Sequence, residues 1–448
     1  MKKLLLVIVL AALGASQSVA QAINVNLTPR QPLTLMGGDM ERSAGFLPHA
    51  TNPQQIADWV YKDIAFTTCR VSFDKQQELI EGVPHFDFYK TPLASMKMVQ
   101  TARPGVKFWA TPKTDYDGFG TENNLPDWIY TGGGYDGGKY DPTKVNVAKF
   151  ARFLADYLQH MHKNGVPITY LSVAKEWKQV FDAEREAATI DALTALLATP
   201  AYQGVPVPLF SGPAGWGVVG TTRFVEDVKA KGFTNRYHGF CAHDYDKPTE
   251  DKWRAFIAAV APTGLEPWNE ESDAGSGGPT AGVEPDFTIP LKAYEKRCQW
   301  YRQGLRGELF FENWSRGINK ETRGVYFTKG GTGTRLRGHY IMQHFANHAA
   351  DSHYLASTTS DLPGVDTMAF RRGQEIILWV LNLSGTPYAN VPITLTGAPL
   401  AKPAIARHQW TASTPLPGVE TNINRTSPTQ FVDTIEGSVI QAYIFTVD

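Results

Sequence analysis

The sequence is short of cysteine and carries no excess of charge of either sign. Its 448 residues include only three cysteines, Cys69, Cys241 and Cys298, so at most one disulfide can form. Cys69 and Cys241 lie in apolar, strand-like segments, and we expect them to be buried free thiols. The 43 lysines and arginines nearly balance the 44 aspartates and glutamates. This balance argues against a nucleic-acid-binding protein, which normally carries a basic excess.

Short motifs for metals and dinucleotides are missing as well. The sequence has no C-x-x-C or H-E-x-x-H spacing, so a structural or catalytic zinc site has no support. No G-x-G-x-x-G follows a strand-like segment, which leaves a dinucleotide site without support. We therefore expect a protein that needs no metal and no organic cofactor.

Long hydrophobic stretches are confined to the N-terminus. Two lysines precede the apolar run LLLVIVLAALGA, and the A-Q-A sequence at 20–22 fits the A-x-A cleavage pattern. The pattern predicts a signal peptide over residues 1–22 and a secreted or periplasmic bacterial protein whose mature chain starts at Gln21 or Ile23. No other stretch reaches the roughly 18 apolar residues of a spanning helix, so we expect no membrane span after signal removal.

Aromatic and turn-forming residues are plentiful instead. Aromatics make up 12% of the chain, with 11 tryptophans and 18 tyrosines, a surplus that suits either a carbohydrate-binding cleft or a large core. Hydrophobic residues at 42% exclude wholesale disorder. The 40 glycines and 29 prolines indicate a loop-rich fold and exclude a helical bundle.

Strand-like and helix-like segments alternate from about residue 33 to residue 330. Helical patterns such as PQQIADWVYKDI (53–64) and KVNVAKFARFLADYLQHMHKNG (144–165) separate the strands. The alternation predicts a (β/α)8 TIM barrel over residues 34–335, with a doubly wound open sheet as the alternative. The eight strand-like segments are LTLMGG (33–38), FTTCRVSF (66–73), KFWATP (107–112), ITYLSV (168–173), VPLFSG (207–212), YHGFCAH (237–243), LEPWNE (265–270) and ELFFENW (308–314).

The pattern changes after about residue 335. One more helical segment, RLRGHYIMQHFANHAADS (335–352), is followed by alternating strands separated by Gly, Pro and Asn turns. This pattern predicts an antiparallel β-sandwich over residues 336–448. The segment INVNLTPRQPL (23–33) has the pattern of a strand that can join this sandwich and hold the two domains together. No linker rich in Pro or Ser separates the domains, which favours a packed interface.

Reactive groups of such a barrel sit at the C-terminal ends of its strands. Two acidic residues there, Glu176 after the fourth strand and Glu271 after the seventh, would face each other across the barrel mouth. Glycoside hydrolysis needs two carboxyl groups of this kind, one protonated and one ionised. The other polar and aromatic residues at strand ends are Arg42, Arg70, Trp109, Lys113, Lys175, His243, Tyr245, Glu270, Glu312 and Trp314.

Four short motifs resemble a known group of enzymes. ITYLSVAKEW (168–177), GLEPWNEES (264–272), GFCAHDY (239–245) and CRVSF (69–73) are similar to strands four, seven, six and two of the retaining (β/α)8 glycoside hydrolases of clan A. The barrel with its flanking strand and C-terminal sandwich most resembles glycoside hydrolase family 30.

The resemblance implies a role for each matching residue. Glu176 would be the acid/base and Glu271 the nucleophile of a double displacement through a covalent glycosyl-enzyme. Tyr245 would donate a hydrogen bond to the nucleophile, and Arg70 would stabilise its charge. We expect His243 to neighbour the nucleophile or the substrate, and Trp109 and Trp314 to stack on sugar rings, with core packing as the alternative for all three.

Two positions depart from the clan's pattern. The clan usually has Asn before the acid/base, where this chain has Lys175. Together with Lys113, Arg70 and Arg42, Lys175 would suit a uronate- or sulfate-bearing glycan; alternatively it pairs with Glu270 or Glu312 and binds nothing. Glu270 precedes the nucleophile, and neighbours in a strand should point to opposite faces. The spacing from Trp268 selects Glu271, whereas a slip of one residue would select Glu270.

The sequence thus predicts a secreted retaining β-glycoside hydrolase that acts on a polysaccharide or an oligosaccharide. The alternative from another class is a non-catalytic carbohydrate-binding protein on a hydrolase-like barrel, which the change from Asn to Lys175 allows. A surface adhesion protein is not favoured, because no anchor, repeat or sorting signal is present. The sugar, its linkage and the oligomeric state are not indicated.

Overall fold

The computed structural model describes residues 21–113, 125–131, 144–176, 182–272, 286–314 and 324–448. The predicted signal peptide lies outside these ranges apart from its last two residues. None of the helices described combines the length and the hydrophobicity that crossing a membrane requires.

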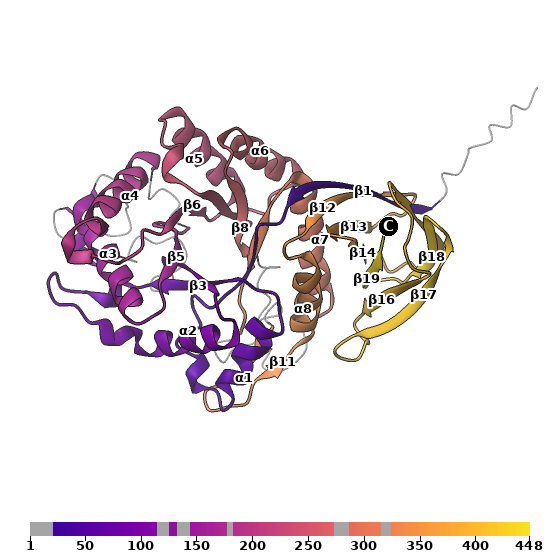
Figure 1. Cartoon of the computed structure of the whole chain (residues 1–448), viewed down its shortest axis with the longest axis horizontal. Helices are drawn as coiled ribbons and strands as arrows, with labels where there is room; N and C mark the ends of the chain where they lie inside the picture. The colour runs from indigo at the N-terminus through magenta and orange to yellow at the C-terminus, as the bar shows by residue number, and fades with distance from the viewer. Residues whose placement is uncertain (1–20, 114–124, 132–143, 177–181, 273–285, 315–323) are drawn as a thin grey trace, which may run out of the picture.

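Eight parallel strands close into a barrel, which confirms the fold predicted from the alternating segments (Figure 1). The sheet closes where β2 pairs with β9, with Gly38 opposite Phe310, and this closure excludes the doubly wound alternative. Each of the eight predicted segments overlaps one strand. The strands are β2 (Leu35–Asp39), β3 (Thr68–Phe73), β4 (Lys107–Pro112), β5 (Ile168–Leu171), β6 (Leu209–Gly215), β7 (Gly239–His243), β8 (Glu266–Ser272) and β9 (Gly307–Phe310).

Helices surround the barrel and bury their apolar faces against it (Figure 1). In α3, the Asn146 side chain accepts a hydrogen bond from the Lys149 amide and caps the first turn, and the helix ends at Asn164 and Gly165 as predicted. The helices are α1 (Pro53–Ala57), α2 (Lys90–Ala102), α3 (Val147–Lys163), α4 (Ala183–Leu197), α5 (Val218–Ala230), α6 (Glu250–Val260), α7 (Thr288–Gln303) and α8 (Arg337–Ala349).

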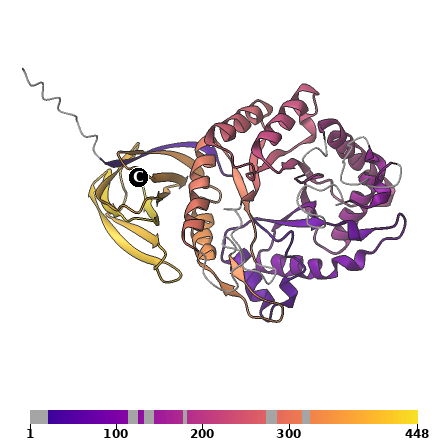
Figure 2. The same cartoon turned by 180° about the vertical axis from the view of Figure 1, so that it is seen from behind.

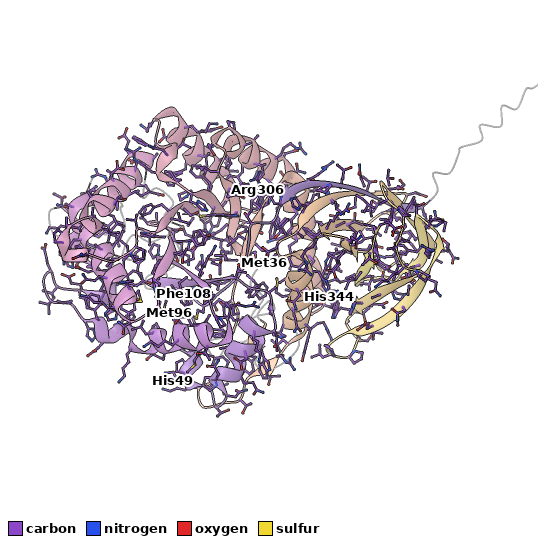
Figure 3. The ribbon with its side chains drawn as sticks, viewed as in Figure 1. Met36, His49, Met96, Phe108, Arg306 and His344 are labelled. Carbon is purple, nitrogen blue, oxygen red and sulfur yellow. The ribbon has the colours of Figure 1, made fainter. Side chains whose placement is uncertain are left out.

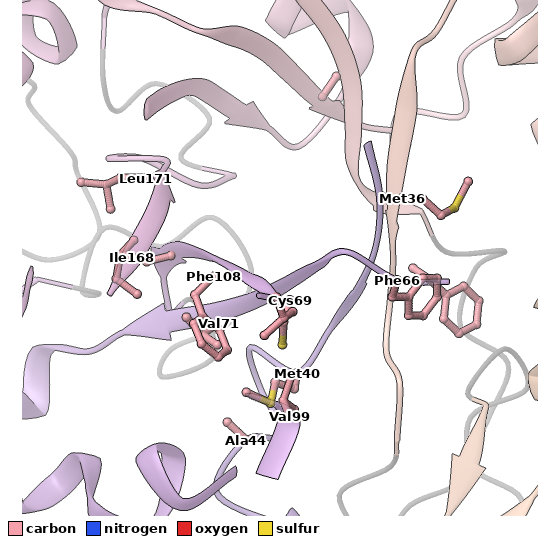
Figure 4. Packing of buried hydrophobic residues seen from close by; sticks show 14 of the residues in the cluster. Met36, Met40, Ala44, Phe66, Cys69, Val71, Val99, Phe108, Ile168 and Leu171 are labelled. Atoms are coloured by element: carbon pink, nitrogen blue, oxygen red, sulfur yellow. The ribbon is translucent and has the colours of Figure 1, made fainter. Parts of the chain in front are cut away.

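The main core lies between the strands and these helices. Figure 4 shows Cys69 and Val71 of β3 and Phe108 of β4 on the side that faces Val99 of α2. Close packing continues inside the barrel. A Cβ added to Gly37 on β2 would lie 2.4 Å from the Thr68 carbonyl oxygen, so only glycine fits between the adjoining strands.

The lower part of the barrel interior is a small apolar floor. Trp109 stacks on Tyr170 with ring centroids 5.0 Å apart, and its edge meets Trp268 at 5.5 Å. Cys241 belongs to the same cluster. The three cysteines are buried and free, as expected for Cys69 and Cys241.

The second domain is a nine-stranded closed sheet that the N-terminal strand completes (Figure 1). Strand β1 pairs antiparallel with β12 and parallel with β15, so the predicted antiparallel sandwich contains one parallel pair. Strands β12 and β17 contain few apolar residues, so the alternation of apolar and polar residues that marks the other strands is weak in them. The strands are β1 (Ala22–Pro32), β12 (His353–Ser360), β13 (Val365–Arg372), β14 (Glu375–Asn382), β15 (Tyr388–Thr396), β16 (Ala404–Trp410), β17 (Val419–Ser427), β18 (Gln430–Ile435) and β19 (Val439–Thr446). A short hairpin, β10 (Val325–Tyr326) and β11 (Thr334–Arg335), precedes α8.

Apolar packing joins the two domains. Phe345 of α8 contacts the rings of Tyr301 on α7 and Trp379 on β14, at centroid distances of 6.1 and 5.7 Å. The main core therefore runs without a break from the barrel helices into one face of the second sheet. Figure 2 shows the same contact from behind, with the second sheet against the last barrel helices.

Candidate active site

Four parallel strands bring six of the predicted residues into one buried cluster. A barrel places the C-terminal ends of its strands on one rim, so residues far apart in the sequence converge there. The six are Arg70 at β3, Lys175 and Glu176 after β5, His243 and Tyr245 at and after β7, and Glu271 on β8.

Glu271 is held as a carboxylate by three donors. The Tyr245 hydroxyl donates to Oε1 at 2.6 Å, Arg70 donates to Oε2, and the Lys175 ammonium lies 3.4 Å from Oε2. Burial alone would raise the pKa of Glu271, but the charges of Lys175, Arg70 and His243 outweigh it and hold the pKa well below its usual value. Glu271 is therefore ionised at neutral pH, as a nucleophile must be.

Glu176 stands in a strained backbone conformation beside Glu271. Its φ is 53°, a left-handed value that costs a non-glycine residue roughly 1–3 kcal/mol. Its amide donates to the Ala214 carbonyl at 2.8 Å. One carboxylate oxygen of Glu176 lies within 4.8 Å of one from Glu271, and both side chains are about 1% exposed. The second oxygen, Oε2, is buried and accepts no hydrogen bond within the described part of the chain.

His243 links the two carboxylates. Its Nδ1 donates to Glu176 Oε1 at 2.9 Å and lies 3.7 Å from Glu271 Oε2. Burial alone would lower the pKa of His243, but the charge of Glu271 and the hydrogen bonds to Glu176 and Glu270 outweigh it and raise the pKa to about 9. The pair of His243 and Glu176 therefore holds a proton at neutral pH.

Glu270 points into the same cluster as Glu271, which corrects the expectation that the two face opposite sides. The pairing between β7 and β8 skips Glu270: Ala242 lies opposite Asn269 and His243 opposite Glu271. Such a bulge turns two consecutive side chains to one side of the strand.

Glu270 has a different set of partners from Glu271. Its Oε2 accepts hydrogen bonds from the Ser172 hydroxyl and the Cys241 thiol, both at 3.0 Å, and its Oε1 lies 3.4 Å from Arg70. Burial raises the pKa of Glu270, but the hydrogen bond from His243 and the charge of Arg70 outweigh it and lower the pKa below the usual value. Glu270 therefore sits between the apolar floor and the pair of facing carboxylates.

Lys175 pairs with Glu41 at 2.9 Å and with Glu271, which differ from the expected partners Glu270 and Glu312. Glu41 lies just after β2 and is itself buried. Burial would lower the pKa of Lys175, but the charges of Glu271 and Glu41 outweigh it and raise the pKa above its usual value. Lys175 is therefore charged, and it faces carboxylates of the protein.

Two acidic residues of the site, Asp39 and Glu41, were missed by sequence reasoning. Asp39 ends the first barrel strand and Glu41 follows it, in GGDMERSAG, where only Arg42 was considered. Asp39 accepts a hydrogen bond from Arg70, and burial raises the pKa of Asp39 to about 7 despite the charge of Arg70. The rule that reactive groups follow barrel strands could have found both residues. Ser172 carries no comparable sequence signal.

The two tryptophans expected to stack on sugars lie in packed interiors. Trp109 is fully buried in the barrel floor, and its indole donates to Ser172 at 3.0 Å. Trp314 is fully buried in the main core, and its indole donates to the Ser43 carbonyl at 3.1 Å. Neither ring offers a free face to a sugar, because neighbouring side chains cover it. Trp109 instead supports Ser172, which holds Glu270.

Lys113 lies outside the cluster, in an adjoining pocket. The pocket has a volume of about 430 Å³ and is lined by Arg42, Lys113 and Lys329 together with Glu41 and Asp74. Arg42 and Lys113 lie 3.9 and 3.8 Å from Glu41 and Asp74. Glu41 connects the pocket to the cluster, because it also binds Lys175.

Glu176, His243 and Glu271 also have the spacing of a three-residue metal site, with donor atoms within 4.8 Å of one another. The surroundings do not suit a cation. Glu271 already accepts hydrogen bonds from Arg70 and Tyr245, and Lys175 adds a second positive charge beside it. A further cation would be repelled there, so the cluster fits acid–base and nucleophilic chemistry better.

The sequence matches no family model and no curated protein. Solved structures share its fold over nearly the whole length of both chains. One is a glycoside hydrolase family 30 subfamily 8 xylanase from Clostridium acetobutylicum, with a TM-score of 0.70 and 14% identity, covering 95% of this chain and 99% of that one.

Two further structures are similar in the same way. A conserved exported protein from Bacteroides fragilis gives a TM-score of 0.69 at 12% identity, covering 94% of this chain and 100% of that one. A family 39 β-xylosidase from Caulobacter crescentus gives a TM-score of 0.60 at 13% identity, covering 95% and 100%. The fold expected from the resemblance to family 30 is thereby confirmed.

Proposed function

We propose that this protein is a secreted retaining β-glycoside hydrolase with Glu176 as acid/base and Glu271 as nucleophile. The observation that carries the proposal is the contrast between two facing carboxylates. Glu271 is bound by Tyr245, Arg70 and Lys175, while Glu176 accepts a hydrogen bond from His243. Retaining enzymes hold their carboxyl groups about 5–5.5 Å apart, whereas inverting enzymes need about 6.5–9.5 Å to admit a water. Oxygens within 4.8 Å favour retention.

The proposed reaction has two displacements. In the first, a Glu271 oxygen attacks the anomeric carbon, the glycosidic C–O bond breaks, and the proton held by His243 and Glu176 passes through Glu176 to the leaving oxygen. In the second, Glu176 takes a proton from water, the water oxygen attacks the anomeric carbon, and the ester bond to Glu271 breaks. Tyr245 and Arg70 bind the Glu271 carboxylate before and after the covalent stage, which leaves its geometry ready for the next cycle.

The substrate we propose is a polysaccharide or an oligosaccharide that bears uronate or sulfate groups. Lys175 and Arg70 are bound to carboxylates of the protein. The adjoining pocket adds three further basic residues to its lining, Arg42, Lys113 and Lys329, and such a group would bind there. Guanidinium and ammonium groups bind carboxylates and sulfates through charge-assisted hydrogen bonds. Glu41 lines the pocket and binds Lys175, and Lys175 in turn lies beside the proposed nucleophile Glu271.

We also propose the domain limits and the export of the chain. Residues 1–22 would be the cleaved signal, 23–33 the strand that joins the second domain, 34–335 the catalytic barrel and 336–448 the second domain. A structure of the same fold is described as an exported protein, which agrees with the signal-like N-terminus.

Product release from a panel of soluble glycans tests the proposal. The panel contains neutral xylan, β-1,6-glucan and galactan beside uronate-bearing and sulfated glycans, with Glu176→Gln as the blank, and products are identified by mass spectrometry. We expect products from charged glycans that the blank does not release. Products from neutral glycans alone would remove the role of Arg42 and Lys113. Binding without products, unchanged in Glu176→Gln, would favour the carbohydrate-binding alternative.

A further inference from the structure

Three histidines meet in a groove between the barrel's last helix and the second domain. His344 and His348 lie one turn apart on α8, and His408 comes from β16. The ring centroid of His344 is 4.1 Å from that of His408 and 5.0 Å from that of His348. The groove has a volume of about 250 Å³. Figure 3 shows His344 on α8 where the helix meets the second sheet.

Carboxylates lie beside two of the three rings. Glu375 accepts a hydrogen bond from His348 Nδ1 at 3.0 Å, and Glu420 lies 3.9 Å from His408 Nε2. A carboxylate accepts, so Nδ1 of His348 is the donor to Glu375, and Nε2 is the nitrogen available to a metal ion. A carboxylate behind a histidine in this way is the usual support of a metal-binding imidazole.

His344, between the other two rings, has an unsatisfied nitrogen. Its Nε2 is out of contact with solvent and has no hydrogen-bond partner among the described residues. Buried polar atoms normally have a hydrogen-bond partner. The unpaired Nε2 of His344 therefore either destabilises the fold or marks a place for a ligand.

We propose that His344, His348 and His408 bind one divalent transition-metal ion, such as Zn²⁺, which joins α8 to strand β16 of the second sheet. Imidazole nitrogens suit Zn²⁺, Ni²⁺ and Cu²⁺, and two histidines one helical turn apart present their rings on the same face. The three nitrogens are less tightly grouped than those of Glu176, His243 and Glu271, so the ion must draw the rings together by rotation about their side-chain bonds. The site is independent of the barrel chemistry.

Titration calorimetry with ZnCl₂ on the purified chain, first treated with a chelator, tests the site. We expect one equivalent to bind and the melting temperature to rise. His344→Ala and His408→Ala should each weaken the affinity by about 10–100-fold or more, and Glu375→Gln by about 10-fold through the support of His348. His353→Ala, which removes an exposed histidine of the same domain, is the matched control and should leave the affinity unchanged.

Two results would overturn the proposal. One is the absence of binding at millimolar Zn²⁺ by a chain that melts cooperatively. The other is binding that survives in His344→Ala and His408→Ala but is lost in Glu176→Gln, because the ion would then sit in the barrel. Melting curves of all variants without metal separate the loss of a ligand from a failure to fold, and Glu375→Gln keeps every histidine in place.

Discussion

Glu270 and Glu271 point to the same side of strand β8, although they are neighbours in the chain. The bulge that skips Glu270 in the pairing with β7 allows this. The two carboxylates have different hydrogen-bond partners. Glu270 turns to Ser172 and Cys241 near the floor, while Glu271 turns to Tyr245. Two acids side by side could each be taken for the nucleophile, and their partners distinguish them.

Replacing the two carboxylates one at a time should identify the nucleophile. We expect Glu271→Gln to lower turnover by several orders of magnitude, because no covalent intermediate can form. Glu270→Gln should lower it far less, since the amide can still accept from Ser172. Azide added to Glu271→Ala should restore product formation and give a glycosyl azide of inverted configuration, seen by NMR. If azide instead rescues Glu270→Ala, the assignment of the two residues is reversed.

Lys175 should matter to stability through Glu41. Both side chains are buried, and Lys175→Asn, which restores the residue usual in clan A, would leave Glu41 without its cation. Breaking a buried ion pair at one partner costs about 3–5 kcal/mol. We expect urea unfolding to show such a loss for Lys175→Asn and a smaller loss for the double variant Lys175→Asn/Glu41→Gln. Strictly additive losses would mean that the two residues do not interact.

The proton shared by His243 and Glu176 should set the alkaline limit of activity. Because the pKa of His243 is raised to about 9, kcat/KM should fall as the pH rises through about 9. In His243→Gln the imidazolium that holds this proton is absent, so the fall of kcat/KM near pH 9 should disappear. If kcat/KM of this variant falls at the same alkaline pH as in the wild type, His243 does not hold the proton that the reaction uses.

The same shift of the His243 pKa links folding to pH. The folded pKa lies above the unfolded value of about 6.5, so its contribution to the free energy of unfolding is complete below about pH 6.5 and disappears as the pH rises through about 9. Wild type should therefore lose more stability than His243→Gln between pH 6.5 and pH 9, measured by urea unfolding. Equal losses in the two proteins would contradict the raised pKa.

Trp109→Phe separates support of the site from contact with the substrate. The change keeps an aromatic ring in the floor but removes the hydrogen bond to Ser172. We expect a loss of about 1–2 kcal/mol in unfolding free energy and a modest fall in kcat, with KM unchanged. A large rise in KM with kcat unchanged would show that the indole binds sugar. Trp253→Phe, in a core remote from the rim, is the matched control.

The barrel and most of its site followed from the sequence because both obey simple geometry. Alternating segments fix the parallel strands, and strand ends gather at one rim, so Arg70, Glu176, His243 and Glu271 could be placed together. The bulge at Glu270 could not, because it is a shift in the pairing of β8 with β7, and the sequence pattern does not specify that pairing residue by residue. Trp109 and Trp314 could not be placed either, since an aromatic ring suits a packed floor as well as a sugar. Strand β17 was missed because its sequence, VETNINRTS, has only two apolar side chains.

The place of β1 ties together the first and last parts of the chain to be synthesised. Residues 22–32 pair with β12 and β15, which leave the ribosome more than three hundred residues later. Until they arrive, β1 has no partners, and without β1 the second sheet keeps two unpaired edges. No single cut in the chain therefore gives two complete domains. A barrel fragment that ends before β12 would keep β1 without its partners, and a fragment that begins at α8 would lack β1. An expression strategy for the isolated second domain has to fuse residues 22–32 to it as a separate strand.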